Sequence, residues 1–197
     1  MRIKEEISNE IVIDKSRFIC YLNRAFNEEE ARNYLSRIKK LHPQATHHCY
    51  AYITNNNMVE RFSDDGEPSG TAAKPMLDVL HKNNLEDVIV IVVRYFGGIK
   101  LGAGGLIRAY SNSVSNTLCE ATLVTPTQIN LYQLKFGYEY INSINYLLNE
   151  TKILKKDYEV FVYYEFVTND DKLINKIIET TKGQFIPEFI KQIEIEL

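Results

Sequence analysis

The sequence contains few cysteines: Cys20, Cys49 and Cys119 in 197 residues. None of them belongs to a C-x-x-C pair, so the sequence predicts neither a disulfide framework nor a cysteine zinc site. No apolar run approaches the ~20 residues that a membrane-spanning helix needs. Residues 1–6 lack the apolar core of a secretion signal. We therefore expect reduced thiols and a cytoplasmic protein that has no membrane partner.

Arginine is absent from residues 125–197, where eight lysines face eleven acidic residues. All eight arginines lie in residues 1–124, where fifteen basic residues balance fifteen acidic ones. Because arginine holds phosphate with two parallel hydrogen bonds, any phosphate site is expected in the first part of the chain. The net charge of −3 excludes the overall basic surplus that marks a dedicated nucleic-acid binder.

The hydrophobic pattern predicts two α+β domains, residues 1–125 and 126–197, joined near Pro126. In the first domain, Asn27 and Glu30 form a capping-box signal for a helix. The first predicted elements of this domain are strands at 5–13 and 18–22 and a helix over 27–41. Strands at 48–54 and 58–63 follow, around a turn at Asn55-Asn56-Asn57. The remaining elements are a helix after 70 with Pro75 in its first turn, a buried strand at 88–94 and a helix from about Gly104.

The second domain repeats a simpler pattern. Its predicted elements are strands at 129–136, 152–155 and 159–167, helices around 141–148 and 173–178, and a last strand ending at Leu197. This β-α-β-β-α-β order is that of a ferredoxin-like sandwich.

Five of the nine glycines lie in residues 97–105, directly after the apolar run of residues 88–93. Glycines gather where the backbone turns at positive φ or comes very close to another segment. The free amides of a helix beginning near Gly104, flanked by Arg94, Lys100 and Arg108, would suit an anion. The alternative is packing alone, with Tyr95 and Phe96 in the core. On this helix, the side chains expected to face the core are Ile107, Tyr110, Val114, Leu118 and Ala121.

The glycine-rich segment does not match known cofactor loops. No Gly-Lys-Ser/Thr closes a Walker A loop, and Ile107 stands where the dinucleotide fingerprint needs its third glycine. We therefore expect no nucleotide cofactor.

Residues 63–71 form an acidic loop with Asp64, Asp65 and Glu67. These carboxylates suit either a divalent cation or acid–base chemistry, but their spacing does not fit an EF-hand. The alternative is a turn whose aspartates bind local amides, with Thr71 as helix N-cap. Both this loop and the glycine-rich segment follow a strand and precede a helix. The sequence therefore predicts that they share one surface, with Arg94 as the counter-ion of Asp64 or Asp65.

His47 and His48 precede a strand, so their side chains point to opposite faces and cannot bind one metal ion together. The chain has no Gly-x-Ser-x-Gly nucleophile elbow, and Cys49 lacks an activating context. We therefore predict no turnover of nucleotides, phosphoesters or dipeptides, and no resident metal. The alternative is a hydrolase that uses the acidic loop with His47 or His48.

The chain resembles the IMPACT family over its full length, and several segments carry this resemblance. They are Lys15-Ser16-Arg17-Phe18-Ile19, His47-His48 with Ala51-Tyr52, residues 63–68 with Gly70-Thr71-Ala72, and residues 93–98 with Lys100-Leu101-Gly102 and Gly104-Gly105-Leu106. The resemblance implies a first domain similar to the second domain of a small-subunit ribosomal protein. It also implies a ferredoxin-like second domain, a pair similar to the fourth and fifth domains of elongation factor G.

Eukaryotic members of the family carry a different extra domain and restrain the kinase that stops translation initiation during starvation, by competing for its ribosome-associated activator. For the bacterial branch the resemblance implies a link to translation and no settled reaction. We thus expect a non-enzymatic regulator that binds RNA or the ribosome, with a translation-associated protein as a further partner. Its expected surface is Arg94, Gly97, Gly98, Lys100, Gly102, Gly104, Gly105 and Arg108, with Lys15, Arg17 and Lys74 beside it. A protein-interaction scaffold is the other non-enzymatic alternative.

Overall fold

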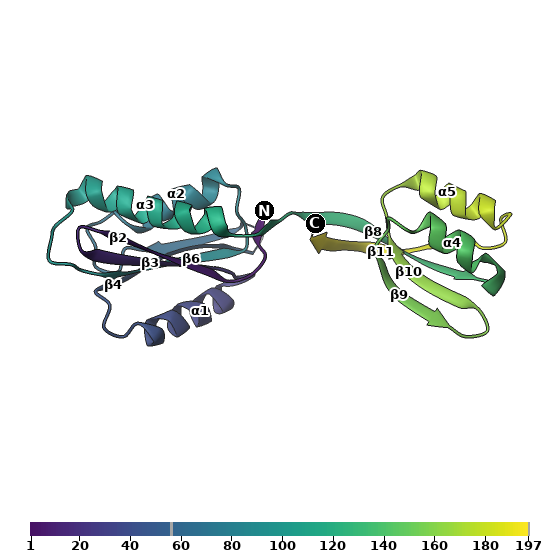
Figure 1. Cartoon of the computed structure of the whole chain (residues 1–197), viewed down its shortest axis with the longest axis horizontal. Helices are drawn as coiled ribbons and strands as arrows, with labels where there is room; N and C mark the ends of the chain where they lie inside the picture. Colours follow the sequence, from purple (N-terminus) through teal and green to yellow (C-terminus); the bar gives the residue numbers. More distant parts are fainter. Residues whose placement is uncertain (56, 197) are drawn as a thin grey trace. The chain divides into compact units, whose positions relative to one another are not determined.

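The computed structural model describes residues 1–55 and 57–196, and the chain divides into two compact units, residues 1–125 and 126–197 (Figure 1). The predicted turn at residues 55–57 includes Asn56, and the predicted last strand ends at Leu197, so these two positions lie outside the described residues. Among the described helices, none combines the length and the apolar character needed to cross a membrane.

Unit 1 is built on a five-stranded antiparallel sheet in the order β2-β3-β6-β4-β5. Its strands are β2 (Ile7–Ile13), β3 (Ser16–Arg24), β4 (His47–Thr54), β5 (Val59–Ser63) and β6 (Val88–Tyr95). A separate antiparallel pair joins β1 (Arg2–Ile3) to β7 (Leu123–Val124), which ties the beginning of this unit to its end.

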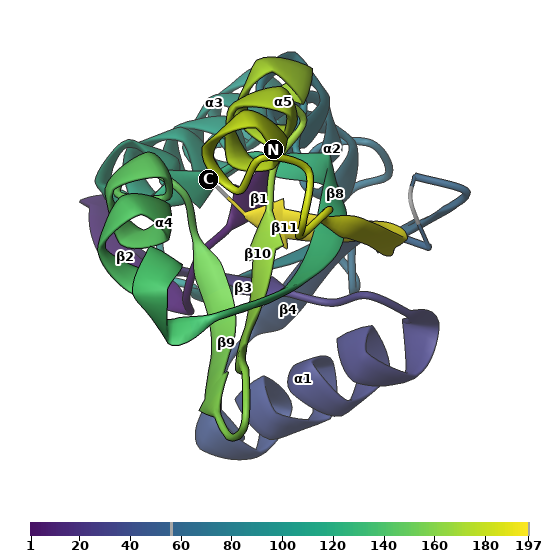
Figure 2. The same ribbon diagram turned by 90° about the vertical axis from the view of Figure 1, so that its right-hand side faces the viewer.

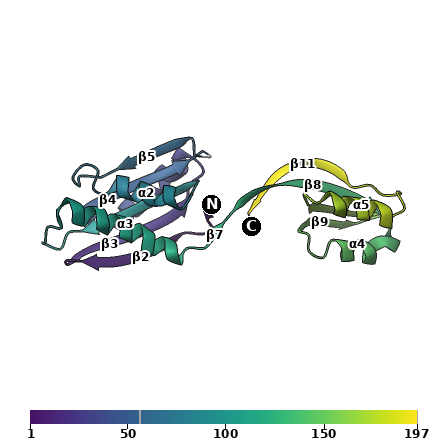
Figure 3. The same ribbon diagram turned by 90° about the horizontal axis from the view of Figure 1, so that it is seen from above.

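Helices cover both faces of this sheet. Helix α1 (Glu28–Leu41) lies on one face, and α2 (Ala73–Lys82) and α3 (Gly102–Glu120) lie on the other (Figures 1 and 2). Figure 3 looks onto the face that α2 and α3 cover. Alternate residues of the central strand β6 serve the two cores: Val88, Val90 and Val92 under α2 and α3, and Ile89, Ile91 and Val93 under α1. A strand buried on both faces has no polar side to alternate with, which accounts for its unbroken apolar sequence.

The helix starts show where local sequence signals decide the structure. The Asn27 side chain accepts from the Glu30 amide at 2.9 Å, and the Glu30 carboxylate accepts from the Phe26 amide at 2.8 Å, so the predicted N-cap is confirmed. Helix α3 begins at Gly102, earlier than predicted. The prediction that Ile107 faces the core was wrong, since Ile107 is 42% exposed. Leu106, the preceding residue, is the one that α3 buries at this position.

Unit 2 has the predicted element order. It consists of β8 (Pro126–Phe136), a short 3-10 turn (Tyr138–Tyr140), α4 (Ile141–Leu147), β9 (Ile153–Tyr158), β10 (Val162–Val167), α5 (Asp171–Thr180) and β11 (Glu188–Glu196). The strands form an antiparallel sheet in the order β11-β8-β10-β9, with α4 and α5 packed over one core. The α+β class is confirmed. The predicted strand start was wrong at Val160, which lies between β9 and β10 and is 86% exposed.

Candidate functional site

Strand register places three side chains in a row at one end of the unit 1 sheet. Arg94 of β6 lies opposite Phe18 of β3 on one side and opposite His47 of β4 on the other. The alternation that puts Val92 under α2 and α3 puts Arg94 on the same face. His48 lies opposite Val93, on the α1 face, so the prediction that the two histidines point to opposite faces is confirmed.

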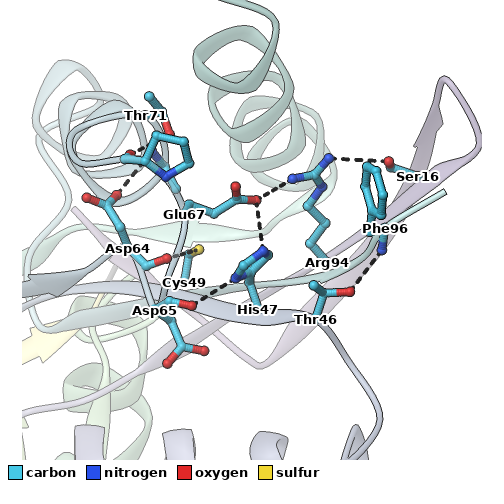
Figure 4. A network of polar contacts seen from close by, with 12 residues as sticks. Ser16, Thr46, His47, Cys49, Asp64, Asp65, Glu67, Thr71, Arg94 and Phe96 are labelled. Carbon is cyan, nitrogen blue, oxygen red and sulfur yellow. Dashed lines mark hydrogen bonds and ion pairs between the residues drawn. The ribbon is translucent and has the colours of Figure 1, made fainter. Parts of the chain in front are cut away.

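Arg94 forms a buried ion pair with Glu67, from the loop between β5 and α2 (Figure 4). Its Nη1 lies 2.6 Å from Glu67 Oε1, and the two side chains are only 6% and 3% exposed. The Tyr110 hydroxyl of α3 donates to the same oxygen at 2.8 Å. The prediction that Asp64 or Asp65 is the counter-ion of Arg94 was therefore wrong. The longer Glu67 side chain reaches Arg94, while the two aspartates accept hydrogen bonds from backbone amides.

The Asp64 carboxylate caps helix α2 from outside the helix. It accepts from the amides of Gly70 at 2.8 Å, Ala72 at 3.1 Å and Ala73 at 2.8 Å. These amides have no carbonyl partner within the helix, and a carboxylate at a helix start is favoured by the helix dipole. The predicted N-cap Thr71 was wrong: its hydroxyl donates to the Pro68 carbonyl at 2.7 Å.

Asp65 is also held by its neighbours. Its Oδ2 accepts from the His48 amide at 2.7 Å, and Lys39 Nζ lies 3.5 Å from Oδ1. With Asp64 on α2 and Glu67 on Arg94, all three carboxylates of the acidic loop have protein donors. Among the described residues, no group of three or more His, Cys, Asp and Glu side chains is placed to hold a metal ion. These contacts favour orienting roles for the acids over acid–base catalysis.

Arg94 is clamped between two aromatic rings. Its guanidinium lies 5.3 Å from the centre of the Phe18 ring and 5.4 Å from that of Phe96. Its Nη2 lies 3.4 Å from Ser16 Oγ, which in turn accepts from the Gly97 amide at 3.1 Å. The alternative that placed Phe96 in the core was wrong, since Phe96 is 46% exposed.

A pocket of about 340 Å³ opens beside this pair. It is lined from both predicted loops, by Thr46, His47, Glu67, Pro68, Arg94, Phe96, Lys100, Leu101, Gly102, Ala103 and Leu106. The prediction that the acidic loop and the glycine-rich segment share a surface is therefore confirmed. Sequence reasoning assigned no site role to Thr46, Pro68, Leu101 or Leu106. Pro68, Leu101 and Leu106 belong to the segments that resemble the family, and that resemblance is the signal that could have found them.

The glycines of residues 97–105 have distinct backbone roles. A Cβ atom on Gly97 would lie 2.0 Å from the Lys15 carbonyl carbon, so only glycine lets this segment pass the turn between β2 and β3. Gly98 and Gly102 have φ angles of +87° and +68°. Gly104 and Gly105 lie in the first turn of α3. Together these glycines bring the start of α3 against the pocket.

Two exposed cations lie beside the start of α3, whose first residues line the pocket. Lys100 lines it, and the Arg108 guanidinium folds back over the start of α3, 3.6 Å from the position of a Cβ on Gly104. Neither pairs with a carboxylate in the described part of the chain. No side chain of the described residues caps the first turn of α3, so its amides are free for an anion. We call Lys100, Arg108 and these first-turn amides the basic rim.

The other basic residues predicted for this surface, Lys15, Arg17 and Lys74, do not line the pocket. Lys15 is exposed in the turn that Gly97 contacts. Arg17 binds Glu10 at 2.9 Å and lies 5.2 Å from the centre of the Tyr95 ring. Lys74, in α2, lies 3.8 Å from Asp78.

The histidines and the thiol near the pocket are tied to the fold. His47 Nδ1 donates to the Asp65 carbonyl at 2.9 Å, which leaves Nε2 facing Glu67 at 3.8 Å. Burial lowers the pKa of His48. Burial also raises the pKa of Cys49 to about 12, which keeps this thiol protonated and a poor nucleophile.

Replacing Asp64 with alanine is expected to lower the free energy of unfolding of unit 1 by about 2–3 kcal/mol, because two helix-start amides and the Gly70 amide of the preceding loop lose a charged acceptor. Urea titration followed by hydrogen exchange of the β6 amides reports on this unit alone. Asp78→Ala is the matched control: it removes an exposed carboxylate from α2 and should cost less than about 0.5 kcal/mol. Equal effects of the two substitutions would contradict the capping role.

Comparison with known proteins adds relatives that share this site region. Residues 14–118 match the model of the Impact N-terminal domain. IMPACT family member YvyE of Bacillus subtilis (strain 168) is 46% identical over 167 residues, covering 84% of this chain and 77% of YvyE. IMPACT family member YigZ of Escherichia coli (strain K12) is 39% identical over 155 residues, 76% of each chain. A crystal structure described as that of a hypothetical protein aligns over 96% of both chains, with 32% identity and a TM-score of 0.61.

Proposed function

The chain belongs to the IMPACT family, and from this premise we propose that it is a non-enzymatic, translation-associated regulator of the cytoplasm that binds RNA through unit 1. The RNA is either a free single strand or an exposed strand of the ribosome. The link to translation rests on the role of the eukaryotic family members. The link to RNA rests on one observation: Lys100, the first residues of α3 and the exposed Phe96 ring line the same pocket.

The basic rim supplies what a phosphate needs. Lys100 and Arg108 are exposed and free of carboxylate partners among the described residues, so they need not break an ion pair to bind an anion. The uncapped start of α3 adds amide donors and the positive end of the helix dipole. Arg94 takes no direct part in this proposal, because Glu67 neutralises it inside the protein.

The aromatic ring supplies what a base needs. RNA-binding proteins select single strands by stacking unpaired bases on aromatic or guanidinium planes. Phe96 is half exposed at the pocket, and the Arg94 guanidinium lies against its ring. A site that combines a phosphate anchor with a stacking surface fits RNA better than it fits an inorganic anion.

Unit 2 is assigned a different role. It has no arginine, and its acidic surplus would repel phosphates. We propose that it contacts a translation-associated protein or orients unit 1. A catalytic role for the site is disfavoured, because each carboxylate of the acidic loop is already bound and the Cys49 thiol is protonated.

RNA binding by the full chain is expected to weaken steeply with salt. Two phosphate contacts release counterions from a single strand, so affinity should fall about sevenfold between roughly 50 and 200 mM salt. Fluorescence anisotropy of a labelled single-stranded oligoribonucleotide measures this directly. Binding that does not change with salt would exclude the basic rim as a phosphate site. No binding at any salt would leave the protein-interaction scaffold as the better account.

A further inference from the structure

We propose that the pocket beside Phe96 receives a single unstacked nucleobase, so that the site selects single-stranded over paired RNA. The inference rests on the proposed function and names the part of the RNA that the pocket takes. It is carried by the size of the pocket, its walls and the groups at its floor.

The pocket is small and has mixed walls. Its volume of about 340 Å³ is near the lower end of small-ligand sites, which span roughly 300–1,000 Å³. That space suits one planar ring system and excludes a stack of bases or a duplex. Pro68, Leu101 and Leu106 supply apolar surface to the faces of such a ring.

Arg94 acts here as a support rather than as a phosphate ligand. Glu67 and Ser16 fix its guanidinium at two of its nitrogens, and only 5% of the residue is exposed. Fixed in this way, the guanidinium lies 5.4 Å from the centre of the Phe96 ring and holds that ring at the pocket wall. A ring held in advance loses little conformational entropy when a base stacks on it.

The floor of the pocket presents hydrogen-bond acceptors. The Asp65 carbonyl can only accept, so His47 Nδ1 donates to it and the Nε2 edge of the ring is left at the pocket. Glu67 contributes a carboxylate beside it. Acceptors of this kind pair with an exocyclic amino group, which adenine carries, so oligoadenylate is the appropriate probe.

The chain contains no tryptophan, so Phe96→Trp introduces a single tryptophan at the pocket wall, and its emission can be excited selectively over that of the 13 tyrosines. On adding a single-stranded adenylate hexamer, we expect the F96W emission to be quenched as anisotropy reports binding. A longer, stable duplex that contains the same run of adenylates should cause little quenching. Phe96→Ala should weaken hexamer binding by about 5- to 150-fold, the range that loss of one stacked base produces.

Phe62→Ala is the matched control, because Phe62 is a similarly exposed phenylalanine, 52% accessible, on β5 and does not line the pocket. It should leave hexamer affinity unchanged. Wild-type affinity in Phe96→Ala, or unchanged F96W emission at saturating hexamer, would overturn the base pocket while leaving RNA binding intact. If the hexamer fails to bind at any salt but AMP quenches F96W, the base pocket stands and the RNA function falls. If neither ligand binds, both fall.

Discussion

Replacing Arg94 with methionine is expected to lower the free energy of unfolding of unit 1 by about 3–5 kcal/mol. The substitution keeps an apolar stem between Phe18 and Phe96 but leaves the Glu67 carboxylate buried, without its cation. Burial removes water from the Glu67 carboxylate, and without Arg94 the attraction that offsets this desolvation cost is lost. Urea titration with hydrogen exchange of the β6 amides gives the size of the loss.

The pairwise origin of this loss is tested by a double substitution. Arg94→Met combined with Glu67→Gln removes the unpaired charge, and the amide oxygen of the substituted side chain can still accept from the Tyr110 hydroxyl. The double variant should therefore be more stable than Arg94→Met alone. Arg17→Met, which removes an arginine from an exposed pair with Glu10, should leave unit 1 nearly as stable as the wild type. A double variant no better than the single one would contradict the account.

Reversing the two charges of the basic rim is expected to lower RNA affinity by about 100-fold, roughly tenfold for each residue. At 4 Å in water, an attraction of about 1 kcal/mol between a cation and a phosphate becomes a repulsion of the same size, reduced by salt screening. The double variant is Lys100→Glu with Arg108→Glu. Both side chains are exposed, so stability should change little.

Lys172→Glu with Lys176→Glu is the matched control for that variant. It changes the net charge by the same amount, at exposed positions of α5 in unit 2. Its RNA affinity should stay within about twofold of wild type, since these lysines belong to unit 2 and the proposal gives them no contact with RNA. An equal loss in both double variants would mean that only overall charge matters. Anisotropy of the same labelled strand measures all three proteins.

Element order was predictable from the sequence because it depends on local periodicity. The 3.6-residue spacing of α1 and its Asn27 cap, the unbroken apolar run of β6, and the alternation in β10 are all local signals. The errors fall where an element begins or ends. Val160 continues the alternation of β10 in sequence but lies in the preceding turn, and Ile107 lies one position from the stripe that α3 buries.

The site was predictable to the level of its two loops but not of its contacts. Both loops follow strands of one sheet, and this topology fixes their meeting. Which acidic residue pairs with Arg94 depends instead on the conformation of the loop. The Asp64 side chain accepts from amides at the start of α2, and the Glu67 side chain reaches the guanidinium. Phe96 directly follows β6, in the segment that leads to α3, and its ring stays 46% exposed at the pocket, so the apolar run before it gave no sign of its position.

The central claim is that the basic rim of unit 1 binds RNA in the translation apparatus, and sedimentation of the full chain with purified ribosomal subunits tests it most directly. At about 50 mM salt the wild type and the Lys172→Glu/Lys176→Glu control should travel with the subunits, and both should be released near ~500 mM. Lys100→Glu/Arg108→Glu should stay in the free fraction at both salt concentrations. Sedimentation of that variant with the subunits as fully as the wild type, or a wild type that stays free at low salt, would contradict the claim.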